Sequence, residues 1–206
     1  MENKKIMLFQ GDSITDCDRN RADINSLGDG YVSLLNDKLK DEFRVINKGI
    51  AGDTTQKIKN RWVEDCLDLN PSFLSLYAGV NDTWFRYRFN KETSIEVFEK
   101  NFRYMIDSFK EKYPEVSILL VSPFIIPLED VLEGWFEDLK PKIDMVEALS
   151  KEYKTLYVPL QKIFDEKLKE NSNAGYWVLD GVHPTKEGHK VIAEACFEEI
   201  KKELNK

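Results

Sequence analysis

A serine, an aspartate and a histidine in this sequence have the side-chain types that acyl transfer needs. Ser13 follows the apolar run 6–9 and stands in the block Gly11-Asp12-Ser13. A neutral serine hydroxyl is a poor nucleophile and needs a base within hydrogen-bond reach. The chain has only two histidines, His183 and His189, and these are the two candidates for that base.

His183 is the better candidate for the base. Asp180 lies three residues before it, and this spacing lets the carboxylate accept the Nδ1 proton while Nε2 faces a serine. His189 lies inside an expected helix, where a core or surface role is the simpler interpretation. Two structural alternatives stay open. Ser13 could be a helix N-cap, and Asp180 and His183 could belong to an ordinary exposed turn.

Acyl transfer also needs hydrogen-bond donors for the oxyanion. Besides the backbone N–H of Ser13, the candidates are Gly52, whose backbone a ligand can approach closely, and Asn81, which offers a side-chain amide. Either could instead serve only a turn or a helix cap. Three aspartates near these blocks are interpreted as capping or bracing residues rather than reacting groups: Asp12, Asp53 and Asp82.

Short apolar runs alternate with longer stretches of helical periodicity along the chain. The expected strands are 6–9, 44–47, 72–78, 118–121 and 156–158, and helical spacing of apolar residues is found in 31–39, 58–69, 98–113, 135–153 and 192–204. This alternation predicts right-handed βαβ crossovers in a three-layer α/β/α sandwich around a five-stranded parallel sheet. No repeat, linker or composition break divides the chain, so 1–206 is predicted to be a single domain.

The polar blocks follow the expected strands directly. Ligands of open α/β sheets bind outside the carboxyl ends of the strands. Residues 11–13, 49–54 and 79–82 occupy such positions after the first three strands, and 180–184 precede the last helix. We therefore expect these blocks to meet in one crevice.

Composition excludes several classes of function. The 206 residues are 42% hydrophobic and 33% charged with a net charge of −7, which argues against a disordered chain and against nucleic acid as a partner. The three cysteines form no CxxC pair, so a zinc knuckle is not expected. No apolar stretch has the length of a signal peptide core or a membrane helix, which favours a cytoplasmic protein with no membrane partner. A homo-oligomer stays an alternative to a monomer.

The ordered set of blocks resembles the SGNH hydrolases, also called GDSL-type esterases. The blocks are Gly11-Asp12-Ser13-Ile14, the segment around Gly52, Gly79-x-Asn81-Asp82 and Asp180-x-x-His183. The resemblance implies a flavodoxin-like fold with five parallel strands and a serine esterase that needs no metal or organic cofactor. It also implies Ser13 as nucleophile, His183 as base, Asp180 as the group that orients it, and the Ser13 N–H, Gly52 and Asn81 as oxyanion hole.

A narrower resemblance concerns the substrate. Residues 11–17, 47–50, 61–65 and 81–84 look like those of intracellular acetyl-xylooligosaccharide esterases. In such relatives an aromatic residue precedes the aspartate of the triad, whereas this chain has Leu179 there.

Aromatic and arginine side chains near these blocks suit a sugar. Trp84 and Arg86 follow the Asn81 block, and Trp177 precedes Asp180, so these three are the candidate substrate-binding residues. The alternative is that the aromatics pack in the core and the arginines are solvated. We predict an esterase that removes acetyl or other short acyl groups from a carbohydrate. The alternative functions are those of a lysophospholipase or thioesterase, and of a non-catalytic carbohydrate-binding protein with the same fold.

Overall fold

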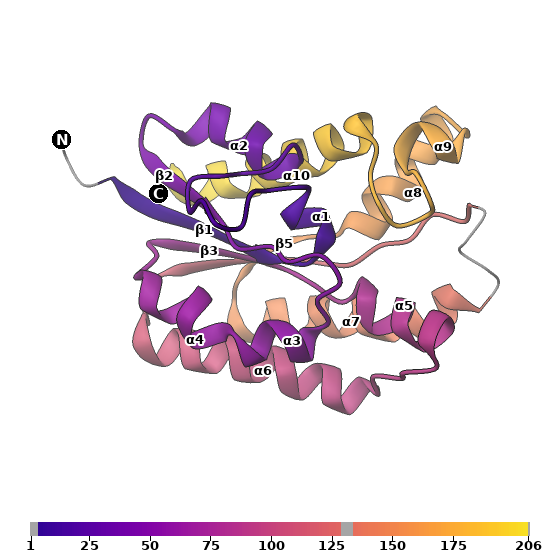
Figure 1. Cartoon of the computed structure of the whole chain (residues 1–206), viewed down its shortest axis with the longest axis horizontal. Helices are drawn as coiled ribbons and strands as arrows, with labels where there is room; N and C mark the ends of the chain where they lie inside the picture. Colours follow the sequence, from indigo (N-terminus) through magenta and orange to yellow (C-terminus); the bar gives the residue numbers. More distant parts are fainter. Residues whose placement is uncertain (1–3, 129–133, 206) are drawn as a thin grey trace.

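A single five-stranded parallel sheet forms the centre of the computed structural model, which describes residues 4–128 and 134–205. The first three residues of the N-terminal segment lie outside this range. The strands are β1 (Lys5–Gly11), β2 (Phe43–Asn47), β3 (Phe73–Tyr77), β4 (Ser117–Val121) and β5 (Leu156–Val158). Their order, β2-β1-β3-β4-β5, is that of flavodoxin-like folds, so the predicted fold class is confirmed (Figure 1).

The inner strands are apolar because helices cover both of their faces. All five residues of β3 are buried, and so are the last four of β4. Leu8 of β1 pairs with Ile46 of β2 on one side and with Leu74 of β3 on the other. These pairings confirm the five predicted strands, with bounds that differ from the expected ones by two residues at most.

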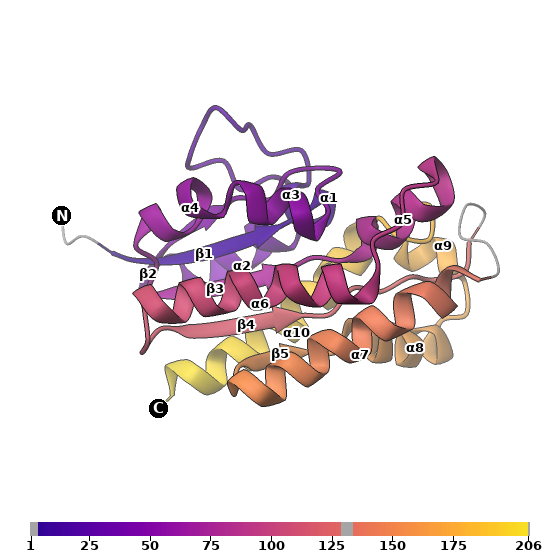
Figure 2. The ribbon, with the colours of Figure 1, turned by 90° about the horizontal axis from the view of Figure 1, so that it is seen from below.

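Two helical layers enclose the sheet (Figures 1 and 2). The layer drawn above the sheet in Figure 1 contains α2 (Tyr31–Leu39), α8 (Leu160–Glu170) and α10 (Lys186–Leu204). The layer below it contains α3 (Thr55–Asn60), α4 (Trp62–Asp65), α6 (Ile95–Lys112) and α7 (Trp135–Tyr153). Each layer has its own apolar core against the sheet.

Helix α6 illustrates how the sequence specifies these layers. Its buried face repeats at helical spacing through Phe98, Phe102 and Phe109, all fully buried. The Ser94 side chain caps its N-terminus by accepting the N–H of Val97. The apolar face and the cap together explain why the segment is helical.

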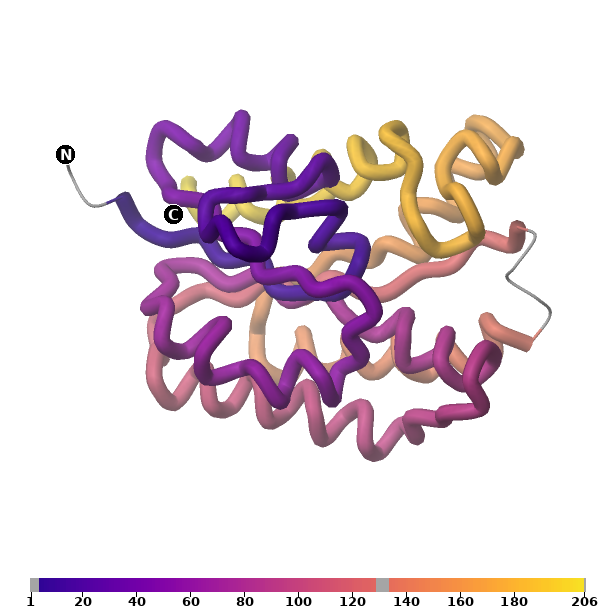
Figure 3. Tube along the Cα trace, viewed as in Figure 1, coloured from indigo at the N-terminus to yellow at the C-terminus, as the bar shows by residue number. Residues whose placement is uncertain are grey.

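Short elements and loops complete the chain. Helix α1 (Ser13–Asp16) follows β1, α5 (Val80–Phe89) follows β3, and α9 (Ala174–Trp177) follows α8, whereas a 3-10 turn at Leu67–Leu69 precedes β3. Figure 3 traces the long segment between α1 and α2 as an indigo tube across the front of the molecule. Among the described residues, no helix combines the length and the apolar character needed to cross a bilayer.

Candidate active site

Ser13 is the first residue of helix α1, and only Asp12 separates it from the carboxyl end of strand β1. The preceding Asp12 caps this helix: its Oδ1 accepts the N–H of Ile14 at 3.0 Å. Asp12 is completely buried, and burial raises the pKa of its carboxyl from 3.8 to about 7. The Asp12 side chain accepts the N–H of Ile14 and not that of Ser13, so this cap leaves the Ser13 N–H available to another acceptor.

The structure brings the serine, the histidine and the aspartate into one hydrogen-bonded line. Ser13 Oγ lies 3.0 Å from His183 Nε2, and His183 Nδ1 lies 2.6 Å from Asp180 Oδ2. The Asp180 Oδ1 atom accepts the backbone N–H groups of Val182 and His183 at 3.0 and 2.8 Å. This geometry lets a base take the serine proton while a carboxylate holds the base in one tautomer.

The pKa shifts of Asp180 and His183 are those expected for a carboxylate that is hydrogen-bonded to an imidazole. Burial opposes ionisation of Asp180, but hydrogen bonds from the ring and backbone of His183 and from Val182 outweigh it and lower its pKa to about 2. The hydrogen bond that His183 donates to Asp180 raises the pKa of His183 above its usual 6.5. The His183 side chain is 39% exposed, so a substrate can reach the ring.

Gly52 lies in a tight turn that faces the same site. The Asp53 N–H donates to Ile50 O at 3.1 Å, and Gly52 has φ +78°, as the third residue of a type II turn requires. A Cβ built on Gly52 would meet no atom within 4 Å. The glycine is therefore explained by its backbone conformation and by an open space beside it, where a ligand atom can approach.

Asn81 lies in the first turn of α5 and is buried against the Gly52 turn. One of its amide hydrogens goes to Asp53 O at 3.0 Å, which leaves the second for another acceptor. The two aspartates interpreted as bracing groups have that role in the structure. Asp53 pairs with Arg61 at 2.7 Å, and Asp82 accepts both the N–H and the hydroxyl of Thr55 at the start of α3.

A cavity of about 750 Å³ opens beside Ser13 and His183. One wall is the polar segment 16–22, and Leu179, Pro184 and Ala51 line other parts of it. Leu179 is 69% exposed, so it forms part of the rim. The polar wall offers hydrogen-bonding groups to whatever is attached to the reacting carbonyl.

The three predicted substrate-binding residues do not line this cavity, although one of them contacts His183. Trp177 is buried, and its indole N–H donates to Asn171 O at 2.9 Å. Arg86 pairs with Asp138 at 2.5 Å and lines a separate cavity. Trp84 touches the triad through its ring, which meets the His183 ring edge to face at 5.9 Å. None of the three lines the cavity that contains Ser13.

His189 is a buried helix residue, and it also forms part of the cavity floor. Its Nδ1 accepts the backbone N–H of Tyr31 at 3.2 Å, so its Nε2 carries the proton and faces the Cys17 sulfur at 3.4 Å. Burial and the nearby charge of His183 lower the pKa of His189 to about 4. The His189 imidazole therefore has a structural role in the packing of the helix and is not a second candidate for the base.

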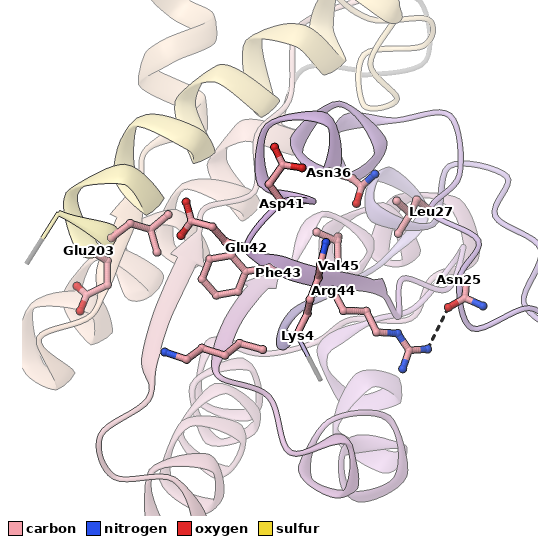
Figure 4. Close-up of a pocket in the computed structure, with 12 residues that line it drawn as sticks. Lys4, Asn25, Leu27, Asn36, Asp41, Glu42, Phe43, Arg44, Val45 and Glu203 are labelled. Carbon is pink, nitrogen blue, oxygen red and sulfur yellow. Dashed lines mark hydrogen bonds between the residues drawn. The ribbon is translucent and has the colours of Figure 1, made fainter. Parts of the chain in front are cut away.

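A larger cavity, about 1390 Å³, lies at the amino ends of β1 and β2, away from the triad. Figure 4 shows its charged lining, in which Arg44 donates to Asn25 Oδ1 at 3.0 Å. None of the predicted site residues belongs to it. Across residues 4–128 and 134–205, no group of three or more His, Cys, Asp or Glu side chains is placed to hold a metal ion.

Two functional candidates were missed by sequence reasoning, which considered the polar loop after Ser13 only as a whole. Asp16 Oδ2 accepts the N–H of Ala51, and Arg19 Nε donates to Gly49 O at 2.9 Å. The one available signal was the position of Asp16 three residues after Ser13, on the same helical turn.

Comparisons with known proteins agree with this geometry. Residues 9–191 match the GDSL-like lipase/acylhydrolase family. The chain is 34% identical to an acetylxylan esterase of Geobacillus stearothermophilus, over 94% of this chain and 93% of the relative. A structure of LAE5, an alpha/beta hydrolase from the metagenome of Lake Arreo, superposes with a TM-score of 0.85 at 26% identity, over 95% of this chain and 94% of that one.

Three further structures are catalytic mutants of Axe2, an acetylxylan esterase from Geobacillus stearothermophilus. In them a serine, an aspartate or a histidine is replaced by alanine, and the last two lie three positions apart, as Asp180 and His183 do. The serine mutant superposes with a TM-score of 0.87 at 30% identity, over 97% of this chain and 96% of that one. The family match spans all four sequence blocks and both ends of the Ser13–His183 hydrogen bond, so this chain belongs to the GDSL-like lipase/acylhydrolase family.

Proposed function

We propose that this protein is a serine esterase that removes acetyl groups from an acetylated carbohydrate, with Ser13 as nucleophile. The observation that carries the proposal is the 3.0 Å contact between Ser13 Oγ and His183 Nε2 at the edge of an open cavity. The family membership supports the ester hydrolysis. The near full-length likeness to an acetylxylan esterase supports the acetylated sugar.

In the first half of the reaction, His183 Nε2 takes the Ser13 proton as Oγ forms a bond to the ester carbonyl carbon. The carbonyl oxygen becomes an anion, for which the Ser13 N–H, the Gly52 N–H and the Asn81 amide are the donors. The carbon–oxygen bond to the sugar then breaks, and His183 gives its proton to the departing alcohol. The acetyl group stays on Ser13.

In the second half, water replaces the alcohol. His183 takes a proton from the water as its oxygen attacks the acetyl carbon, and the same donors stabilise the second anion. Ser13 leaves with the proton from His183, and acetate is released. Asp180 keeps its negative charge throughout, because its pKa of about 2 lies far below neutral pH.

The polar wall of the cavity supports a sugar as the leaving alcohol. Segment 16–22 places Asp18, Asn20 and Arg21 along this wall. A long acyl chain would need a continuous apolar groove in place of these side chains. We infer that the sugar lies against this wall.

The proposal is tested by acetate release from acetylated xylo-oligosaccharides, an acetylated amino sugar and a lysophospholipid control. We expect release from a sugar ester and, among p-nitrophenyl esters, faster hydrolysis of acetate than of octanoate. Faster hydrolysis of octanoate would instead favour a lysophospholipase or thioesterase.

Two serine variants test the nucleophile. Ser13→Ala is expected to lose nearly all turnover with an unchanged melting temperature, whereas Ser72→Ala, at an exposed serine before β3, keeps wild-type activity. A Ser13→Ala protein with wild-type activity would exclude the mechanism, and a wild type that binds sugars without cleaving any ester would be a carbohydrate-binding protein.

A further inference from the structure

We propose that Asp16 is a positioning residue that locks the Gly52 turn onto the helical turn that carries Ser13. The inference rests on the function proposed above, because it concerns the oxyanion donors of that same site. The buried carboxylate of Asp16 holds the nucleophile and the Gly52 N–H at a fixed separation, and catalysis depends on this link.

The link is a direct hydrogen bond between the two segments. Asp16 ends the helix that Ser13 begins, and its side chain is only 4% exposed. Its Oδ2 accepts the N–H of Ala51 at 2.8 Å. Ala51 immediately precedes Gly52, so the bond holds the residue that orients the Gly52 peptide.

Two arginines neutralise the carboxylate that makes this link. Arg21 donates through Nε at 3.1 Å and through its terminal nitrogen to the same Oδ2. Arg19 Nε lies 3.8 Å from Oδ1 and donates to Gly49 O, which adds a second tie to the same loop. A lone carboxylate near the site would oppose the developing oxyanion, and the two guanidinium groups offset that charge.

The loop also packs on the α1 turn without any space between them. A Cβ built on Gly49 would lie 2.2 Å from the Asp16 nitrogen, so only glycine permits this approach. Asn47 joins the same two segments: its amide donates to Thr15 O at 2.6 Å, and its Oδ1 accepts the N–H of Gly49. The base of the loop is thus fixed by packing, and Asp16 is the group that reaches its outer end at Ala51.

Because of this arrangement, loss of the Asp16 carboxylate should affect the chemical step rather than substrate binding. Ala51 is exposed, so without the carboxylate its N–H can turn to water and the turn can rock about its packed base. Such movement displaces an oxyanion donor but leaves the Ser13–His183 contact in place. The loss therefore falls on the stabilisation of the tetrahedral anion.

The test compares Asp16→Ala and Asp16→Asn with wild type on p-nitrophenyl acetate, with active sites counted by titration with a serine-directed phosphonate. Removing an oxyanion donor outright costs on the order of 10²–10³ in rate, so a loosened donor in Asp16→Ala is expected to lower kcat per titrated site by about 10- to 100-fold. KM is expected to change by less than about threefold, because p-nitrophenyl acetate has no sugar that would contact the wall formed by segment 16–22. Asp16→Asn retains an acceptor oxygen and should recover part of the loss.

The affinity for a transition-state analogue distinguishes a positioning role from a purely structural one, because a residue needed only for folding would not change it. For a boronate that adds to Ser13, the inhibition constant should rise in Asp16→Ala by the same factor by which kcat falls. The matched control is Asp138→Ala, which removes another buried carboxylate bridged by two cations, Lys142 and Arg86. It should lower the melting temperature and leave kcat per titrated site and boronate affinity unchanged.

The inference is overturned if Asp16→Ala keeps wild-type kcat per titrated site, or if kcat falls without any loss of boronate affinity. A loss only in the number of titratable sites means that Asp16 is needed for folding alone, which also overturns it. The proposed function fails separately, if the wild type takes no phosphonate at Ser13.

Discussion

Asp180 binds His183 twice, through the ring and through the backbone. Its Oδ2 lies 2.6 Å from Nδ1, and its Oδ1 accepts the main-chain N–H of the same histidine at 2.8 Å. One carboxyl therefore fixes both the imidazole and the loop that carries it. The group that orients the ring lies only three residues away along the chain.

Replacing Asp180 with asparagine is expected to lower kcat/KM by on the order of 10³–10⁴, because the amide stabilises neither the imidazolium nor the required tautomer. The pH profile should also move. Only neutral His183 can accept the serine proton, so activity rises as pH increases through its pKa, which Asp180 raises. In the variant the acid limb of kcat/KM should shift to lower pH, and a midpoint equal to that of the wild type would contradict the assignment.

Two glycines in the same loop should respond differently to alanine. At Gly49 the new Cβ would lie 2.2 Å from backbone, so Gly49→Ala should lose several kcal/mol of stability together with activity. At Gly52 the methyl group enters open space, and the cost is the left-handed backbone alone, about 1–2 kcal/mol.

Urea unfolding and p-nitrophenyl acetate kinetics on both variants check this contrast. Gly52→Ala should stay folded at 25 °C and lose kcat, because the donor peptide shifts. Equal losses of stability in the two variants would contradict the explanation.

His189 should make the protein sensitive to acid. The pKa of His189 is about 4 in the folded state and ordinarily 6.5. Between these values the imidazole is protonated in the unfolded state and neutral in the folded state. The resulting loss of stability grows as pH falls and is complete below about pH 4. At pH 4.5 it amounts to about 2 kcal/mol.

The comparison is between wild type and His189→Gln in urea at pH 7 and 4.5. The variant is expected to be less stable than wild type at pH 7, since Tyr31 N–H loses its acceptor, but to lose less on acidification. Identical losses in the two proteins would show that His189 does not titrate as its burial implies.

Asp12 should have the opposite dependence on pH. Its carboxyl has a pKa of about 7 in the folded state and 3.8 ordinarily, so between these values the folded state retains a proton that the unfolded state has lost. Stability therefore falls as pH rises through this range. The loss is about 4 kcal/mol at pH 8, taken as an upper bound.

Asparagine caps helices as well as aspartate and cannot ionise. Asp12→Asn should therefore gain stability over wild type as pH rises from 4 to 8, as measured by urea midpoints across that range. Parallel curves for the two proteins would show that burial does not hold the proton on Asp12.

Local patterns were enough to predict the strands and to select three side chains that the fold brings together, Ser13, Asp180 and His183. The strand Leu156–Val158 has the bounds that its apolar run indicates. The extension of β1 to Gly11 could not be predicted, because it depends on pairing with Tyr77, 66 positions away along the chain. Asp180 and His183 were found because the carboxylate and the ring belong to one short loop.

Sugar binding by Trp84, Arg86 and Trp177 stays a prediction, and the sequence could not show that none of the three lines the cavity beside Ser13. Aromatic and arginine side chains have the same types whether they face a ligand or the protein. Trp177 fills the core under α10, and Arg86 is engaged by Asp138, a partner 52 positions away. Asp16 was missed because a carboxylate that binds a backbone N–H 35 positions away leaves no periodic signal.

The two helical layers divide the chemistry between them. Ser13 and His183 lie on segments that lead into α2 and α10 above the sheet, whereas the Gly52 and Asn81 blocks lead into α3 and α5 below it (Figure 1). In the proposed mechanism, the groups that transfer the proton and two of the three oxyanion donors thus come from opposite sides of the sheet, and the ester carbonyl binds between them. Damage to one layer can leave a serine that still reacts with strong electrophiles but no longer turns over, so reactivity toward an inhibitor and catalytic competence are separable properties of this enzyme.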